Sequence, residues 1–402
     1  MRSKYNQLQI SFGEQPAIIQ INTDNVEKTP KIYAPREMGQ HPFFLIDKTN
    51  ACKKSRRGYE ALKQQATLEK QGVDKETIIK KTTYQYNPTD SFYTTSKNWT
   101  IVSNPKFGLP DSFDGLVWSY IELLISDIYK KSGKFYYFYY VDPSDIVNYL
   151  IDKGLYKKSG KLYNNVRDSI YRLRYTSYEY AEGFYNKKEE KPLSKYTLSL
   201  IQSIHEQGST LPDGSVATSF AIAIDPLIIQ NYSTNYYLIL LSDYRSKIKS
   251  HPAIALFNRL SYLAFNGIIS RDFTIAKKFK FPFIIVNGYE NLCEFLGLTP
   301  LSENDCRPSN IIRQLKSFID ELIEINCLYE IHVDKSNSST NIIFCLSGDF
   351  IDDATGLLSK AAGNELQFMP TMAECKKYFA KMKKFIHSDK LRKALFNPEH
   401  VD

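Results

Sequence analysis

The chain has 402 residues, of which 43% are hydrophobic and 24% charged, and it carries a net charge of +8 at pH 7. This length suits two or three domains and this composition is globular, so wholesale disorder is excluded. No apolar stretch approaches the ~20 residues that cross a bilayer, and no apolar region follows Met1-Arg2-Ser3-Lys4. We therefore expect a cytoplasmic protein with no membrane partner.

Residues 1–104 show weak hydrophobic periodicity and many Gln, Asn, Thr and Lys residues. Short strand-like stretches occur at 17–21, 43–46 and 99–102. These features predict an N-terminal arm or small subdomain.

The pattern becomes regular after Gly108-Leu109-Pro110, where Asp111 or Ser112 can cap a helix that Gly133 ends. Further elements are expected in this order: a strand at 135–141, a short helix to 150, a third helix at 161–174, and strands at 176–184, 196–205 and 216–224. A winged helix has this order of elements: its helices come first, and a β-hairpin then closes the three-helix core. Here the predicted hairpin has a charged tip. Residues 105–232 are therefore predicted to form winged-helix domain 1.

The same order returns in residues 236–348, which are predicted to form winged-helix domain 2. The expected elements are helices at 253–269, 289–296 and 308–326, strand-like pieces within 273–286, and strands at 328–333 and 341–346. Residues 349–402 read as a linker and a basic C-terminal helix. The predicted fold class is α+β: two tandem winged-helix domains with an N-terminal arm and a basic C-terminal helical tail.

Motifs of common enzymes are missing from the sequence. The six cysteines lie at scattered positions, and there is no His-x-His, no His-Glu-x-x-His, no phosphate-binding loop and no nucleophile elbow. We therefore expect no enzyme activity, no metal and no cofactor.

The third helix of each predicted winged helix is the candidate to enter a DNA major groove. In the second domain, donors precede acids along this helix, whereas the helix dipole alone would favour early acids. That order favours base recognition over an ordinary solvated helix, with Ile311, Ile312, Leu315, Phe318, Ile319 and Leu322 facing inward. The expected DNA-contacting side chains are Lys161, Asn164, Asn165, Arg167, Arg172 and Arg174 in domain 1, and Arg307, Asn310, Arg313, Gln314 and Lys316 in domain 2.

Two loops are candidates for the wings. The loop at 187–191 carries lysines but also two acids, so a solvated turn explains it at least as well. The loop at 335–340 offers Lys335, Asn337 and short hydroxyl side chains that can bond phosphate oxygens.

Two segments of the first domain resemble the replication initiator protein A family of plasmids and phages. They are Phe107-Gly108-Leu109-Pro110 with Asp114, and the helix from Tyr163 to Leu173 with Thr176 close behind. Members share a "yGLP…D" opening and a "Y..L..AL.RL..T" third helix; here Val166 replaces a leucine and Ser169-Ile170 stands for Ala-Leu. The match covers about residues 100–240, and a wider resemblance to tandem winged-helix plasmid initiators covers 105–350.

This resemblance implies a sequence-specific, double-stranded DNA-binding initiator of a plasmid or phage. It would bind repeated origin sequences and recruit host replication initiation proteins and helicase. Such proteins often exchange between a homodimer that represses their own gene and a monomer that binds the origin. The alternative is a winged-helix transcriptional regulator that binds a palindromic operator as a dimer.

Overall fold

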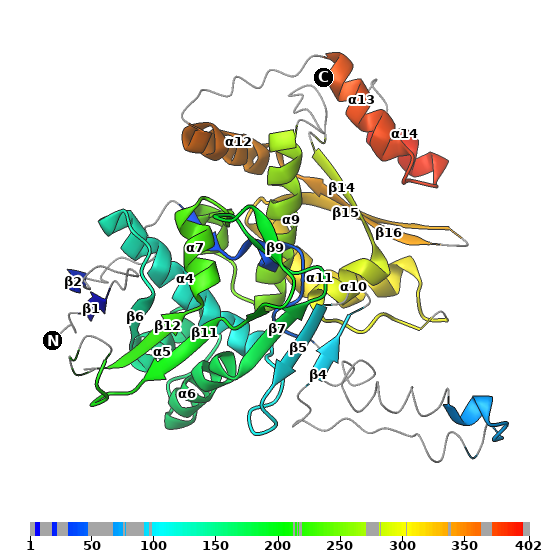
Figure 1. Cartoon of the computed structure of the whole chain (residues 1–402). Helices are drawn as coiled ribbons and strands as arrows, with labels where there is room; N and C mark the ends of the chain where they lie inside the picture. The colour runs from blue at the N-terminus through cyan, green and yellow to red at the C-terminus, as the bar shows by residue number, and fades with distance from the viewer. Residues whose placement is uncertain are drawn as a thin grey trace. The chain divides into compact units, whose positions relative to one another are not determined.

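The computed structural model describes residues 5–8, 18–21, 31–46, 67–74, 77, 92–95, 99–211, 214, 216, 219–270, 281, 283–302, 304–336, 339–362 and 372–396. In these residues the fold is mixed α+β with several small antiparallel sheets (Figure 1). The chain divides into two compact units: unit 1 consists mainly of residues 41–237, and unit 2 of residues 30–40, 238–296 and 300–402. None of the described helices is both long enough and apolar enough to cross a membrane.

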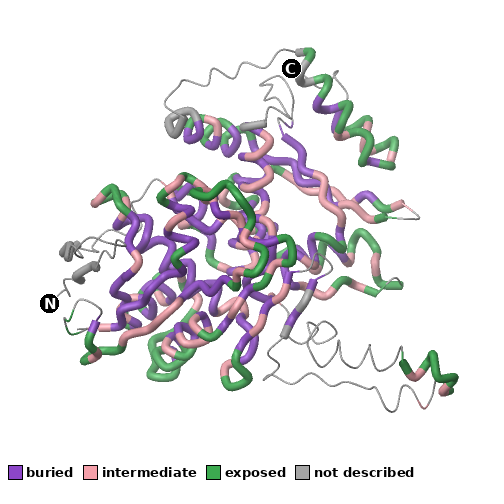
Figure 2. Tube along the Cα trace, in the orientation of Figure 1, coloured by how far each residue is buried: buried purple, intermediate pink, exposed green. Residues whose placement is uncertain are grey.

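The core of unit 1 is built around α4 (Ser112–Ser132), whose residues from 114 to 128 are all buried (Figure 2). The helix begins with a reciprocal capping box. The Asp111 side chain accepts a hydrogen bond from the Asp114 backbone N–H, and the Asp114 carboxylate accepts one from the Asp111 backbone N–H. It ends at Gly133, which adopts the left-handed conformation with φ 68°.

Unit 1 contains the helices and the hairpin that the sequence predicts for a winged helix, with one strand between the first helix and the next two. The connection between the two strands of that hairpin is called the wing below. Its elements are α4, β6 (Phe138–Val141), α5 (Pro143–Asp152), α6 (Gly160–Arg174), β11 (Ile201–His205) and β12 (Phe220–Ile224). The strand order is β11-β12-β6, with both pairings antiparallel. The wing is therefore the connection between β11 and β12, residues 206–219.

Four short strands are inserted between α6 and β11, and they correct the expected hairpin. They are β7 (Thr176–Tyr180), β8 (Phe184–Asn186), β9 (Lys191–Leu193) and β10 (Thr197–Leu198). The expected strand at 196–205 is two strands, because β10 pairs with β7 whereas β11 pairs with β12. Between them the buried Asp225 carboxylate accepts from the Ser199 backbone N–H at 3.2 Å, which holds the chain where it changes sheet. The loop at 187–191 is consequently the tip of the β8–β9 hairpin, outside the wing.

The described parts of residues 1–104 are shared between the two units. Strands β4 (Phe92–Thr94) and β5 (Trp99–Ser103) extend the sheet of unit 1 in the order β10-β7-β5-β4. Strand β3 (Lys31–Ala34) instead pairs with β13 (Leu238–Leu241) in unit 2. The expected strand at 17–21 matches β2 (Ile18–Ile21), which pairs with β1 (Tyr5–Leu8), whereas no strand forms at 43–46. The expected boundary at residue 104 therefore does not coincide with a boundary between the units.

Unit 2 repeats the element order of unit 1. The repeat consists of α9 (His251–Ser270), β14 (Phe283–Gly288), α10 (Tyr289–Leu296), α11 (Pro308–Glu324), β15 (Leu328–Lys335) and β16 (Thr340–Leu346). Its strand order, β14-β16-β15, corresponds strand for strand to that of unit 1. The remaining helices are α7 (Pro226–Ser233) in unit 1, and α8 (Ser242–Arg245), α12 (Gly348–Ala362), α13 (Met372–Lys383) and α14 (Asp389–Phe396) in unit 2.

A buried ion pair joins the first and third helices of unit 1. Arg172 Nη1 lies 2.5 Å from Asp114 Oδ1, and Arg172 Nε donates to the Phe107 carbonyl at 2.7 Å. Asp114 is fully buried and the Arg172 side chain is 18% exposed. Burial, and to a smaller degree the Asp111 carboxylate, raise the pKa of the Asp114 carboxyl to about 6, a rise that the Arg172 guanidinium limits. The guanidinium therefore helps to keep Asp114 charged inside the unit.

Replacing Arg172 with Met should lower the free energy of unfolding of unit 1 by about 3 kcal/mol, because it leaves a buried carboxylate without its partner. The matched control is Arg167→Met on the same helix, since its ion pair with Glu206 is 3.4 Å long and 41% and 47% exposed and should contribute less than about 1 kcal/mol. Both tryptophans of the chain, Trp99 and Trp118, lie in unit 1. Urea unfolding followed by tryptophan fluorescence therefore reports this unit, and equal losses in the two variants would contradict the assignment.

Candidate nucleic-acid interface

Helix α11 presents one polar stripe on its N-terminal half. Its core face is formed by Ile311, Leu315, Phe318, Ile319 and Leu322, all buried as expected. Ile312 was expected among them but is 39% exposed. Position 312 lies at the margin of the core face, with the exposed positions 309 and 316 at helical spacing on its outer side. The outward stripe is therefore Ser309, Ile312, Arg313 and Lys316.

This stripe offers the chemistry that reads base edges. A guanidinium such as that of Arg313 can bond the O6 and N7 atoms of guanine, and an apolar side chain such as Ile312 can contact a thymine methyl group. Arg307 is also exposed, at the N-terminal end of the helix.

The other expected side chains of unit 2 have partners inside the protein. Gln314 accepts a hydrogen bond from the Tyr289 hydroxyl at 2.7 Å, and Asn310 donates to the Asp305 carbonyl at 2.9 Å. Lys335 Nζ donates to the Cys306 carbonyl at 2.6 Å. Lys316 pairs with Asp320 at 2.8 Å on the exposed surface. Asn337 lies outside the described residues.

The acids in the second half of α11 have structural causes of their own. The Glu321 carboxylate accepts the backbone N–H groups of Lys249 (2.9 Å) and Ser250 (3.0 Å), immediately before α9 begins. An acid at this place stabilises the N-terminus of α9. Contacts within the protein therefore account for part of the order of donors and acids along α11, which the sequence analysis attributed to DNA recognition.

Helix α6 exposes a less basic face in unit 1. Lys161, Asn164 and Asn165 are exposed as expected, and Asp168 is exposed on the same helix. The Arg167 guanidinium lies 3.4 Å from Glu206 at the start of the wing and 5.5 Å from the centre of the Phe220 ring. Tyr171 also donates to Glu206, so this carboxylate links the third helix to the wing.

Two arginines of α6 make contacts within the protein. Arg172 forms the buried ion pair with Asp114, which is a correction to its expected place on the DNA-contacting surface: its donors are directed into the unit. Arg174 lies over the Tyr175 ring at 5.6 Å and is half-buried. The aromatic neighbours of this region stack further, since Phe107 lies 5.3 Å from Tyr175.

Two lysines directly before α6, Lys157 and Lys158, were missed from the sequence, whereas Lys161 was predicted. Lys157, Lys158 and Lys161 surround the first turn, and all three are exposed. The helix N-terminus carries a partial positive charge that adds to theirs. The sequence signal was Lys-Lys-Ser-Gly-Lys, a basic cluster around a helix cap.

The C-terminal helices are strongly basic. Residues 372–396 contain eight Lys and Arg residues against two acids, a net +6 within a chain of net +8. Lys376, Lys377 and Lys384 are exposed, whereas Lys383 lies 5.4 Å from the centre of the Phe396 ring. The sequence predicted one basic helix here, and the structure shows two after α12.

The two helices, α13 and α14, are attached to the β15–β16 hairpin of unit 2 by hydrogen bonds near its turn, which is the wing of this unit. The buried carboxylate of Asp334 accepts the backbone N–H groups of His387 at 2.6 Å and Ser388 at 3.1 Å. Asn341, on the other strand of the wing, donates to the Phe385 carbonyl at 2.9 Å. The basic segment is thereby held beside the wing.

A second attachment lies at the edge of the sheet. The Tyr378 hydroxyl donates to the Ile284 carbonyl and accepts the Ile284 backbone N–H at 3.1 Å. Tyr378 also stacks on Phe283, with 5.6 Å between the ring centres. Helix α13 thus satisfies backbone groups that the edge strand β14 would otherwise leave open.

The fold is mixed α+β with several small antiparallel sheets, one element order occurs in both units, and a basic helix pair lies near the C-terminus. No family model matches the chain, and no curated protein matches it either. Among solved structures, it is similar to crystal structures of domains 2 and 3 of RctB. One matches with 12% identity, covering 63% of this chain and 89% of that chain at a TM-score of 0.35. Another matches with 12% identity, 65% and 92% coverage and a TM-score of 0.33.

Replacing Asp334 with Ala should loosen the C-terminal helix pair, because two backbone N–H groups before α14 lose their acceptor. We expect a loss of about 1–2 kcal/mol in local stability, the usual effect of removing a helix cap. Faster hydrogen exchange in peptides covering residues 385–396 would show this loss of local stability. Asp320→Ala, which removes only an exposed ion pair, is the control and should leave that exchange unchanged; a similar increase in both variants would contradict the attachment.

Proposed function

We propose that this protein is a sequence-specific, double-stranded DNA-binding replication initiator of a plasmid or phage. The observation that carries the proposal is the repetition of one helix–strand–helix–helix–hairpin topology in a single chain. We interpret each copy as a winged helix, whose third helix would enter a major groove. Residues 100–240 resemble the replication initiator protein A family, and this resemblance supports a replication origin as the DNA that the protein binds. The proposed partners are origin DNA and the host initiation proteins and helicase.

In the proposed complex, unit 2 contributes the sequence-reading contacts. The exposed stripe of Ile312, Arg313 and Lys316 would lie against base edges, and the lysines of α13 and α14 would contact phosphates beside the wing. Base contacts give specificity, whereas phosphate contacts give affinity that weakens with salt. In unit 1, Lys157, Lys158 and Lys161 would contact phosphates at the start of α6.

Two recognition helices on one chain suit repeated sites. A single monomer can contact two major-groove segments, so several monomers can bind direct repeats in one orientation. Bending or opening an adjacent A·T-rich segment costs several kcal/mol, which multiple bound copies can supply together.

The test of this function uses DNA that flanks the gene. Footprinting should show protection repeated at a constant spacing and in one orientation, and a plasmid carrying the gene with this DNA should be maintained in a host that cannot otherwise replicate the vector. Protection of a single palindrome, without maintenance, would identify the alternative, a transcriptional regulator.

Replacing Arg313 with Ala should weaken binding to the footprinted site by about 1–3 kcal/mol and relax the base preference at one position, because the variant cannot form a bidentate pair with guanine. Binding to random DNA of the same length should change much less. Fluorescence anisotropy on both DNAs measures the difference.

The matched control for Arg313→Ala is a triple substitution of Lys376, Lys377 and Lys384 by Gln, which leaves Lys383 on the Phe396 ring. It should weaken binding equally on both DNAs. The slope of log affinity against log salt should become shallower by about 0.9 for each phosphate that the variant no longer neutralises. Equal weakening by Arg313→Ala on specific and random DNA would show that α11 is not the reading helix.

A further inference from the structure

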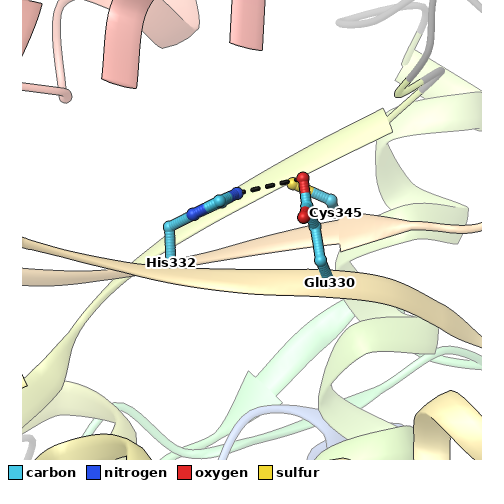
Figure 3. A group of neighbouring side chains, drawn as sticks. All are labelled: Glu330, His332 and Cys345. Atoms are coloured by element: carbon cyan, nitrogen blue, oxygen red, sulfur yellow. Dashed lines mark ion pairs between the residues drawn. The ribbon is translucent and has the colours of Figure 1, made fainter. Parts of the chain in front are cut away.

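Three potential metal ligands of different chemistry converge on the sheet of unit 2. Among the described residues, Glu330, His332 and Cys345 place a carboxylate oxygen, an imidazole nitrogen and a sulfur within 4.8 Å of one another (Figure 3). Glu330 Oε1 lies 3.1 Å from His332 Nε2. The two strands that carry them, β15 and β16, are hydrogen-bonded neighbours at the base of the wing.

A β-bulge brings these side chains to one face of the sheet. Leu328 stands opposite Leu346, but Glu330 stands opposite Cys345, so Tyr329 is an extra residue on β15. Without it, strand alternation would put Glu330 on the same face as Leu328, which is buried in the core. The bulge therefore moves both Glu330 and His332 to the face of Cys345. Bulges that re-aim side chains in this way are enriched beside functional sites.

The imidazole at this point is incompletely satisfied by the protein. His332 Nε2 is buried and makes no hydrogen bond within the described structure, although it faces the Glu330 carboxylate. The Cys345 side chain beside it is fully buried and belongs to no disulfide of the described residues. The Glu330 and His332 side chains are 35% and 27% exposed, so this group of side chains lies near the surface of the unit.

We propose that Glu330, His332 and Cys345 bind a zinc ion. Thiolate, imidazole and carboxylate are the ligands that Zn²⁺ takes in proteins, at about 2.0–2.3 Å each. Tetrahedral coordination at those lengths separates the ligand atoms by about 3.5 Å. The spread of the three atoms in the structure is close enough for side-chain rotation to reach that geometry. A water molecule would complete the four ligands, and the Cys345 thiol would release its proton on binding.

Zinc at this place would link β15 to β16 directly beneath the second wing. The hairpin would then be held by the metal and, closer to the turn on the same strand, by the Asp334 contacts to His387 and Ser388 before α14. This site does not depend on the DNA-binding proposal, because its ligands belong to the sheet face and not to the surface of α11.

The test uses the full chain, freed of any affinity tag and of metal. Titration with Co²⁺ should produce thiolate-to-cobalt charge-transfer absorption, and calorimetry should give one Zn²⁺ per chain. His332→Ala and Cys345→Ala should each weaken binding more than about tenfold. Cys306→Ser, at another cysteine of unit 2, is the control and should bind as the wild type does.

The absence of thiolate-to-cobalt absorption would overturn the proposal. So would absorption that persists in His332→Ala. Because His332 is partly exposed whereas Cys345 is buried, His332→Ala still decides the question if Cys345→Ala fails to fold.

Discussion

The buried carboxylate of Asp114 constrains much of unit 1. It accepts the Asp111 N–H at the start of α4 and pairs with Arg172 on α6, so one side chain both caps the first helix and fixes the third. Arg172 in turn bonds the Phe107 carbonyl, which holds the chain just before α4. A charged group in the interior is tolerated only with such partners. The direction of α6, and therefore the surface that α6 presents, follows from this arrangement.

The same pair explains why the two resemblance motifs occur together. The "GLP…D" segment supplies Phe107 and Asp114, and the "RL..T" segment supplies Arg172 and Thr176. In the structure Asp114 forms an ion pair with Arg172, and the Thr176 hydroxyl lies 3.1 Å from the Ser103 hydroxyl. The residues that suggested a DNA-binding family are thus engaged mainly in holding the winged helix together, while the exposed positions between them face solvent.

Periodicity and caps predicted the helices well, because those signals are local. The expected helix at 289–296 coincides with α10, and those at 161–174 and 308–326 match α6 and α11 within two residues. Strand pairing depends on residues far apart, and for that reason the insertion of β7 to β10 and the sharing of residues 1–104 were not predicted. Among side chains, exposure of Arg313, Lys161, Asn164 and Asn165 followed from helical spacing. The role of Arg172 did not, because only the tertiary structure shows its buried partner. The ligand set of Glu330, His332 and Cys345 was also missed, since strand pairing and a bulge, and no short motif, bring it together.

The pairing of β3 with β13 has a consequence for folding during synthesis. Residues 31–34 bond to residues 238–241, roughly 200 residues later in the chain. At about 5–20 residues per second, a ribosome needs roughly 10–40 s to make the partner strand. During that time Ile32 and Ala34, which are buried in the folded unit, have no partner strand to pack against. Unit 2 is therefore completed late, and until β13 is made its first strand is open to chaperones or to mispairing with a second nascent chain.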